Sequence, residues 1–309
     1  MNSVNRRTFI KTGIAAGAAA VTGGGVFSRA ISAPPPPDLA EARVKDLYDA
    51  ARQAVDRLGG ITRFVTRGDR VGLLINSPFR NPGTHTHPDV ALAVAALCRE
   101  AGARKMTTLK NPPGGHWDPA EHAVSEAETL KLLIPAGGAY SDHQLKGTQA
   151  LKKADIIREL FEVDVFINIS IVKHHVGTNF SCILKNMMGA LPHHTCRYFH
   201  MGTGKPGWYG DLDHMNRCIA DINSVRPPDL SVVDASSFIL TNGPFGPGKL
   251  ATENAVVAGV EAKVGASLVL ATVIVKACSE SLIQSATRRV TSIRSAISAA
   301  MRGQTPPLS

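Results

Sequence analysis

Apolar and polar positions along the chain follow two periods, and together they predict a succession of strands and helices. Residues 70–76 form a short apolar run that ends in a polar loop, which is typical of a buried strand. Residues 88–101 have helical spacing, with Thr86 placed to cap the helix and Pro88 suited to its first turn. Residues 105–109 predict a second strand. A strand, a helix and a strand in this order imply a parallel pair within an α/β sheet.

Further apolar patterns extend this picture along the chain. Helical spacing predicts three more helices, over residues 39–58, 150–160 and 211–224. The strongest strand pattern, and two weaker ones, predict strands over residues 163–171, 230–234 and 255–260. Residues 264–275 form an apolar run too short to span a bilayer as a helix, and residues 288–302 predict a basic amphipathic helix. The expected fold class is α/β, a mostly parallel sheet flanked by helices in three layers.

The first thirty residues have the layout of an export signal. Arg6 and Arg7 are followed by Phe9 and Lys11, by an uncharged run rich in Ala and Gly, and by a small-residue site ending at Ala30. The paired arginines and the weakly apolar run resemble a twin-arginine (Tat) signal. The alternative is an uncleaved amphipathic helix or a membrane anchor. We therefore expect three parts: a signal peptide over residues 1–30, a Pro-rich linker over residues 31–42 and a single α/β domain over residues 43–309.

The resemblance to a Tat signal implies a transient contact with the Tat translocase and a periplasmic or extracellular location. That pathway exports folded proteins, often with a cofactor already inserted. The signal therefore raises the expectation of a bound cofactor or metal.

Four of the nine net positive charges lie in this N-terminal segment. The chain has 34 Lys and Arg against 25 Asp and Glu, a formal net charge of +9, and the first thirty residues contain four of the basic residues and no acid. The rest of the chain thus holds 30 basic and 25 acidic residues. With this modest excess and 5% aromatic residues, the composition disfavours a nucleic-acid-binding protein. With 44% hydrophobic and 19% charged residues, it also excludes an intrinsically disordered chain.

The five cysteines are not in C-x-x-C spacing, which argues against a cysteine-ligated iron–sulfur cluster or a structural zinc site in this chain. Their number is odd, so at least one thiol is unpaired if all disulfides are internal.

Candidate chemistry gathers in the loops that follow the predicted strands, where ligands bind in open α/β sheets. Those loops are residues 76–87, 110–117, 172–189 and 235–249. Six of the eleven histidines lie between residues 174 and 214, directly after the strongest strand, and they are His174, His175, His193, His194, His200 and His214. Neutral imidazoles bind Zn, Fe, Cu or Ni, whereas Lys, Arg and protonated His bind a carboxylate or phosphate. The spacing leaves both chemistries open, beside the plainer alternative of a histidine-rich surface loop.

Two further features are candidates for binding. His87 precedes a predicted helix N-terminus, where amide groups and the helix dipole favour an anion, although Thr86 capping that helix is an equal alternative. Gly243 and Gly246 belong to a glycine-rich segment that permits close backbone approach to a ligand. The segment contains no nucleotide-binding fingerprint, and the chain has no G-x-S-x-G elbow of a serine hydrolase.

Several of these stretches, taken in order, resemble domain-of-unknown-function family 362. Lys173-His174-His175 followed by Leu184-Lys185-Asn186 and Gly189 is similar to the family's K-x-H and L-K-N-x-x-G core, and Arg197 with His200 resembles its R-x-x-H. The similarity covers about residues 68–260. It implies an α/β fold and a site that uses Lys173, His175, Lys185, Asn186, Arg197 and His200, but no particular reaction. The family's D-P-x-A-x-D stretch is replaced here by residues 261–266, where at best Glu261 keeps an acid.

Two functional classes follow. The first is an exported protein whose His/Lys/Arg-lined site binds a metal or a small anionic molecule, with redox-linked enzymatic activity as one version. The alternative is a non-catalytic periplasmic ligand-binding or assembly factor. In the first class the expected catalytic residues are Lys173, His175, Lys185 and His200. The two histidines among them, His175 and His200, are also the candidate metal ligands. The expected ligand-binding residues are His87, Asn186, Arg197, Gly243 and Gly246. The reaction, the substrate and the oligomeric state are not predicted.

Overall fold

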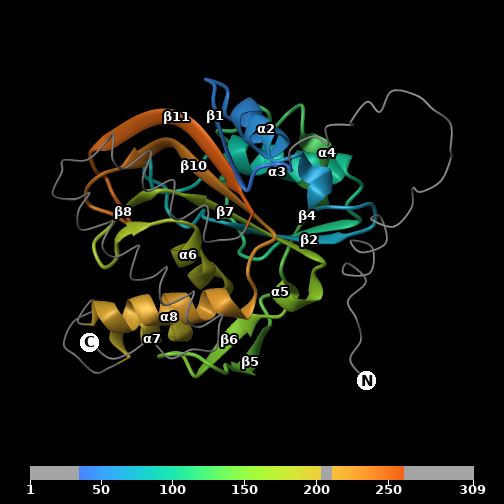
Figure 1. Ribbon diagram of the computed structural model, residues 1–309. Coiled ribbons are helices and arrows are strands. Elements are labelled where there is room, and N and C mark those ends of the chain that lie inside the picture. Colours follow the sequence, from blue (N-terminus) through green and yellow to red (C-terminus); the bar gives the residue numbers. More distant parts are fainter. Residues whose placement is uncertain (1–34, 203–210, 261–309) are drawn as a thin grey trace, which may run out of the picture. The chain divides into compact units, whose positions relative to one another are not determined.

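The computed structural model describes residues 35–202 and 211–260 (Figure 1). In chain order, the strands are β1 (Leu39–Arg43), β2 (Arg70–Ile75), β3 (Lys105–Thr108), β4 (Leu133–Pro135), β5 (Tyr140–Gln144), β6 (Lys153–Ile157), β7 (Val165–Ile171), β8 (Lys173–His175), β9 (Asn179–Ser181), β10 (Leu230–Ile239) and β11 (Leu250–Gly259). The α-helices are α2 (Leu47–Arg57), α3 (Pro88–Glu100), α4 (Ala127–Leu132), α5 (Glu159–Glu162), α6 (Ile183–Asn186), α7 (His193–Met201) and α8 (Leu212–Val225). Two short 3₁₀ turns are η1 (Ile61–Arg63) and η2 (Met187–Ala190).

A seven-stranded sheet forms the centre, in the order β1-β11-β10-β7-β2-β3-β4. The five strands from β10 to β4 are parallel. At one edge, β11 pairs antiparallel with β10, and β1 pairs antiparallel with β11. Two antiparallel pairs, β5-β6 and β8-β9, lie outside this sheet. The expected mostly parallel sheet is therefore confirmed.

Strand β7 lies at the middle of the sheet, and its seven residues are all buried. Val165, Ile167 and Ile169 join the core beneath α2 and α3 on one face. The alternate residue Phe166 joins the core formed with α7 and α8 on the other face, because successive strand residues point to opposite sides. Helices thus cover both faces, as Figure 1 shows, and the three-layer α/β fold is confirmed.

Most predicted elements exist, and two were wrong. Residues 70–76, 88–101, 105–109, 163–171 and 211–224 correspond to β2, α3, β3, β7 and α8, while 230–234 and 255–260 are parts of the longer β10 and β11. The helix predicted over 39–58 is instead β1 followed by α2, and the helix predicted over 150–160 is instead β6 followed by α5. The patterns at 264–275 and 288–302 lie outside the described residues.

The capping of α3 also differs from the expectation. Its N-cap is His87, not Thr86, and the ring Nδ1 of His87 accepts the N–H of Asp89. Pro88 occupies the first turn as predicted. His87 donates its own N–H to Asp234 Oδ2 at 2.7 Å, which joins the start of α3 to β10.

Candidate functional site

A cavity of about 240 Å³ lies where the parallel strands end. Every one of the four loops singled out from the sequence contributes to its wall, together with α7. The lining residues are Ile75, Asn76, Pro78, Phe79, Lys110, Lys173, His175, Ser181, Lys185, Asn186, Met188, Gly189, Cys196, His200, Pro244 and Phe245. The carboxyl ends of parallel strands meet at one edge of a sheet, which is why loops distant in sequence converge there.

Lys173 is the most deeply buried cation of this cavity, with 2% of its surface exposed. It is the first residue of β8, and only Val172 separates it from the end of β7. Its Nζ donates to Asn76 Oδ1 at 3.0 Å and to the carbonyl oxygen of Thr84. The ring of Phe79 lies 4.4 Å from Nζ, in cation–π geometry. Loss of hydration, and secondarily the charge of Lys185, lowers the pKa of Lys173 to about 7.

A row of buried amides holds Lys173 in place. Asn76 donates to Asn186 Oδ1 at 2.9 Å, and Asn186 donates to Asn168 Oδ1 at 2.7 Å. The Nδ2 of Asn186 also lies within hydrogen-bond distance of the Leu74 and Ile169 carbonyls, at 3.1 and 3.2 Å. Asn186 thereby ties the end of α6 to β2 and β7, and through Asn76 it fixes the acceptor of the lysine.

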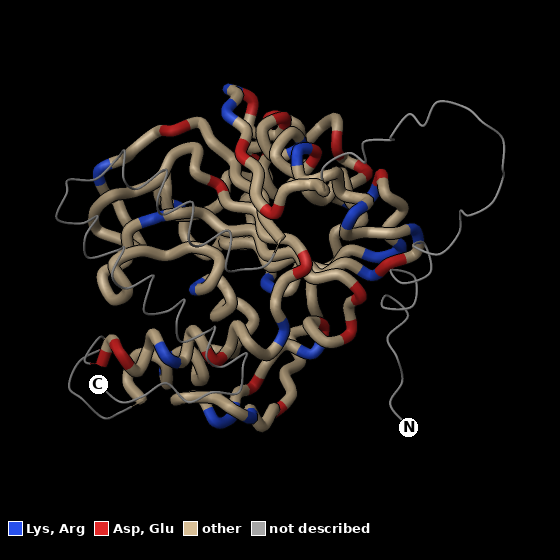
Figure 2. The backbone as a smooth tube through the Cα atoms, viewed as in Figure 1, with Lys and Arg blue, Asp and Glu red and all other residues tan. Residues whose placement is uncertain are grey.

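The cavity wall is rich in positive groups. Lys110, Lys173 and Lys185 line it, and its described lining contains no Asp or Glu. Burial lowers the pKa of Lys185 to about 8, and its Nζ lies 3.5 Å from the Met188 sulfur. Figure 2 shows that basic and acidic residues are interspersed along the described backbone.

The two histidines of the cavity hold opposite tautomers. The Nδ1 of His175 accepts the N–H groups of Gly177 (3.0 Å) and Thr178 (3.2 Å), so the ring proton resides on Nε2. The Nδ1 of His200 lies 2.9 Å from the carbonyl oxygen of Cys196, so here Nδ1 carries the proton and Nε2 is the acceptor nitrogen. Burial lowers the pKa of both rings, that of His175 to about 2, so both are neutral near pH 7. His175 is thus a hydrogen-bond donor and His200 a proton acceptor.

The structure brings together five of the nine predicted site residues in this cavity: Lys173, His175, Lys185, Asn186 and His200. Arg197 lies on the exposed side of α7 and is not part of the lining. His87 is the helix cap described above and also lies outside it.

The two predicted glycines shape the cavity indirectly. Gly243 donates its N–H to His174 Nδ1, and a Cβ at Gly243 would come within 1.8 Å of the His174 carbonyl oxygen, so only glycine fits. Gly246 adopts a φ of +66°, a conformation that glycine tolerates. The residues between them, Pro244 and Phe245, are the ones that line the cavity.

Sequence reasoning missed several lining residues. Lys110 and Asn76 are the first polar residues after β3 and β2, so their position at strand ends was an available signal. Phe79 and Phe245 come from different loops and meet edge to face, with ring centroids 5.0 Å apart. Nothing in the sequence pairs those two rings.

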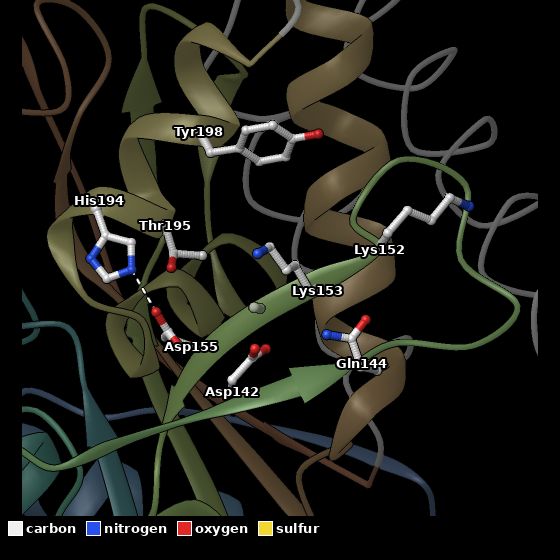
Figure 3. Close-up of a pocket in the computed structure, with 9 residues that line it drawn as sticks. Asp142, Gln144, Lys152, Lys153, Asp155, His194, Thr195 and Tyr198 are labelled. Carbon is white, nitrogen blue, oxygen red and sulfur yellow. Dashed lines mark hydrogen bonds and ion pairs between the residues drawn. The ribbon is translucent and has the colours of Figure 1, made fainter.

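A second hollow, of about 510 Å³, lies between the β5-β6 pair and α7. Figure 3 shows His194, Thr195 and Tyr198 on one side and Asp142, Gln144, Lys152, Lys153 and Asp155 on the other. His194 Nε2 lies 2.6 Å from Asp155 Oδ2. Acids and bases share this hollow and compensate one another, unlike the cavity at the strand ends.

Among residues 35–202 and 211–260, no group of three or more His, Cys, Asp and Glu side chains is arranged to hold a metal ion. The metal-ligand hypothesis for His175 and His200 therefore needs further ligands from elsewhere. The four cysteines in this part of the chain, Cys98, Cys182, Cys196 and Cys218, are free thiols. None of the described helices has the length and hydropathy needed to cross a membrane.

Two family models match the sequence. The model described as "Domain of unknown function (DUF362)" matches residues 71–262. The model of the TAT (twin-arginine translocation) pathway signal sequence matches residues 3–23.

Similarity to individual proteins is more distant. The thylakoid-associated protein sll1697 of Synechocystis sp. is 28% identical over 206 residues, which cover 64% of this chain and 61% of that protein. The chain thus spans about three fifths of that relative's length. The lactate racemase apoprotein of Thermoanaerobacterium thermosaccharolyticum is similar in structure, with a TM-score of 0.45 and 13% identity, over 72% of this chain and 54% of that one. A Thermotoga maritima protein of known crystal structure has a TM-score of 0.37 and 15% identity, over 60% and 50% of the two chains.

Proposed function

The chain belongs to the DUF362 family and carries a Tat signal that indicates export, and from this premise we propose that its cavity binds a small oxyanion, a carboxylate or phosphate group, after export. Lys185 and Lys110 supply the positive charge of the proposed site, and Lys173, whose pKa is about 7, adds to it in its protonated form.

The observation that carries the proposal is the uncompensated charge of the cavity. Buried ammonium groups are costly unless an opposite charge accompanies them. No carboxylate belongs to the described lining, and the hydrogen-bond acceptors of Lys173 are both neutral. An oxyanion of the ligand supplies the missing negative charge and accepts charge-assisted hydrogen bonds from the lysines. His175 is a neutral ring in the same wall.

The proposal is tested by calorimetric titration of the purified protein with sulfate and with acetate. Lys185→Met removes one charge from the cavity wall, and we expect it to weaken binding at least about tenfold, since hydrogen bonds to charged groups contribute roughly 1.5–3 kcal/mol. Lys131→Met removes the same charge from an exposed position, where Lys131 pairs with Glu128, and it serves as the matched control. Binding that is absent, or equally affected by both substitutions, contradicts the proposal.

A metal site remains a second candidate because of the hydrogen bonding of His200. Metal-ligating histidines donate one ring N–H to a carbonyl or carboxylate and bind the metal through the other nitrogen, and the His200 bond to the Cys196 carbonyl has this form. Elemental analysis of the protein purified after export tests this version. A stoichiometric metal that is lost in His200→Ala supports it, and a metal-free protein that still binds oxyanions excludes it.

A further inference from the structure

The amine of Lys173 has surroundings that differ from those of a lysine that only binds an anion. Its two acceptors, Asn76 Oδ1 and the Thr84 carbonyl, are uncharged. A neutral amine has two N–H bonds, and these two acceptors satisfy both, which leaves the nitrogen lone pair for another partner. The side chain is 2% exposed, so water competes little for that lone pair.

A second lysine stands close enough to favour the neutral form. The charge of Lys185 lowers the pKa of Lys173, in addition to the larger effect of burial. A desolvated lysine beside another cation is one of the ways in which proteins produce a nucleophilic amine near neutral pH. Lys185, whose pKa is the higher of the two, remains the cation that holds a carboxylate.

The remaining wall supplies what a carbonyl group needs. The neutral His175 carries its ring proton on Nε2, and the neutral His200 carries its ring proton on Nδ1, so the wall holds two neutral rings suited to proton transfer at a carbonyl group. Ile75, Phe79 and Met188 form an apolar part of the same wall. A volume of about 240 Å³ admits a molecule with a short hydrocarbon body.

We propose that Lys173 forms an imine with the carbonyl carbon of a small 2-oxo carboxylate bound in the cavity. This inference rests on the anion-binding function proposed above, because Lys185 and Lys110 hold the carboxylate of the same ligand. It goes further by assigning a covalent step to Lys173 and by identifying the ligand as a 2-oxo acid.

Imine formation needs no reactant besides the Lys173 amine and the carbonyl group of the ligand. The Lys173 lone pair forms a bond to the carbonyl carbon, the C=O π electrons move to oxygen, and that oxygen takes up a proton. The nitrogen then loses a proton, which gives a carbinolamine, and the hydroxyl group takes up a second proton. The nitrogen lone pair forms the C=N double bond as the C–O bond breaks with release of water, and the nitrogen loses its remaining proton to leave the imine. One amine and one carbonyl group thus yield one imine and one water, and nothing is oxidised or reduced.

Reductive trapping tests the inference on the unaltered protein. The protein purified after export is incubated separately with glyoxylate, pyruvate and 2-oxoglutarate in the presence of cyanoborohydride, and modified lysines are located by peptide mass spectrometry. We expect at least one of the three to give close to one reduced adduct per chain, on Lys173. Lys173→Arg is expected to abolish the adduct, whereas Lys131→Arg, which alters an exposed lysine, is expected to leave it unchanged.

An adduct on Lys185 or spread over exposed lysines overturns the inference, as does the absence of any adduct with all three acids. Calorimetry with the same acids separates this failure from failure of the proposed function. Binding without an adduct leaves the oxyanion site intact and removes only the imine. Neither binding nor an adduct contradicts both.

Discussion

Asn186 connects the lining of the cavity to the central sheet through several hydrogen bonds. Its amide group lies within hydrogen-bond distance of Asn76, of Asn168 and of the carbonyl groups of two neighbouring strands. Asn186 is only 6% exposed, so water has little access to these hydrogen bonds. Asn186 is therefore a positioning residue, acting on Lys173 through Asn76.

Replacing Asn186 by Ala leaves several buried polar groups without partners. We expect Asn186→Ala to lower the free energy of unfolding by about 2–4 kcal/mol, since each unsatisfied group costs roughly 1–3 kcal/mol. Urea denaturation measures the difference. Asn216→Ala, on the half-buried side of α8, is the control and is expected to change stability by less than about 0.5 kcal/mol. Equal effects of the two substitutions would show that the amide row contributes nothing special.

The two buried lysines predict a bell-shaped pH dependence of imine trapping. As the pH rises through about 7, Lys173 loses its proton and becomes nucleophilic. As it rises through about 8, Lys185 loses its proton and the carboxylate loses its partner, so trapping declines. The maximum is expected between these values, with a falling limb that Lys185→Arg moves to higher pH, because an arginine stays protonated. The other titratable groups that face or influence Lys173 are Lys110, His85, His175, His200 and Cys196.

The initial rate of reductive trapping with pyruvate, measured from pH 6 to pH 10, checks this profile. A rate that rises steadily to pH 10 in both the unaltered protein and Lys185→Arg would show that ordinary exposed lysines are reacting, because their usual pKa is near 10.4.

The clustering of residues after the strongest strand, together with the family resemblance, pointed to much of the cavity lining. Lys173, His175, Lys185, Asn186 and His200 were predicted because they cluster after the strongest strand and resemble a family motif. Arg197 belongs to the same motif, yet the turn of α7 places it on the exposed side. A motif gives the spacing of residues, whereas the face of the helix on which each lies depends on how α7 packs.

At the scale of elements, Asp221 explains why residues 150–160 are not a helix. This buried carboxylate on α8 accepts the N–H groups of Gln149, Ala150 and Leu151 at 2.9, 2.7 and 2.8 Å. Those bonds hold the chain in the turn that leads into β6, which then pairs with β5. The spacing of apolar residues suits either structure, and β5 itself is too polar to be recognised as a strand.

Asp221→Asn exchanges one accepting oxygen for a donor that faces N–H groups. We expect it to destabilise the protein by about 2–4 kcal/mol and to increase hydrogen exchange at residues 149–151. Asp213→Asn, at an exposed position of the same helix, is the control and is expected to leave both unchanged. Unaltered exchange at residues 149–151 in Asp221→Asn would contradict the assigned anchoring.

Strand β1 illustrates a second limit of sequence patterns. Its residues, LAEAR, favour a helix by composition. They nevertheless form a strand, because residues 39–43 pair antiparallel with residues 255–259 at the sheet edge. The partner strand is more than two hundred residues away, so no local pattern contains that information. The positions of β2, α3, β3 and β7 were predictable because the apolar pattern of each lies within one short stretch of the sequence.

At the scale of the whole molecule, the sequence resemblance to family 362 and to a Tat signal is confirmed. The family match covers residues 71–262, close to the expected 68–260. The altered stretch at residues 261–266 lies outside the described residues.

Export is expected to depend on the paired arginines. We expect Arg6→Lys combined with Arg7→Lys to retain the protein in the cytoplasm, because lysine lacks the planar, multidentate guanidinium group. Cell fractionation measures the distribution, and Arg29→Lys is the control that keeps the pair. We expect the exported protein to begin at Ile31, which N-terminal sequencing checks. Export of the double variant at the control level would contradict the Tat assignment.

The most direct test of the oxyanion site is a crystal structure of the protein soaked with selenate, whose selenium is located by anomalous scattering. We expect a selenium peak inside the cavity, with selenate oxygens within hydrogen-bond distance of Lys185 Nζ and of at least one of Lys110 and Lys173. A cavity that stays free of selenate at a concentration that fills other sites on the protein would contradict the account.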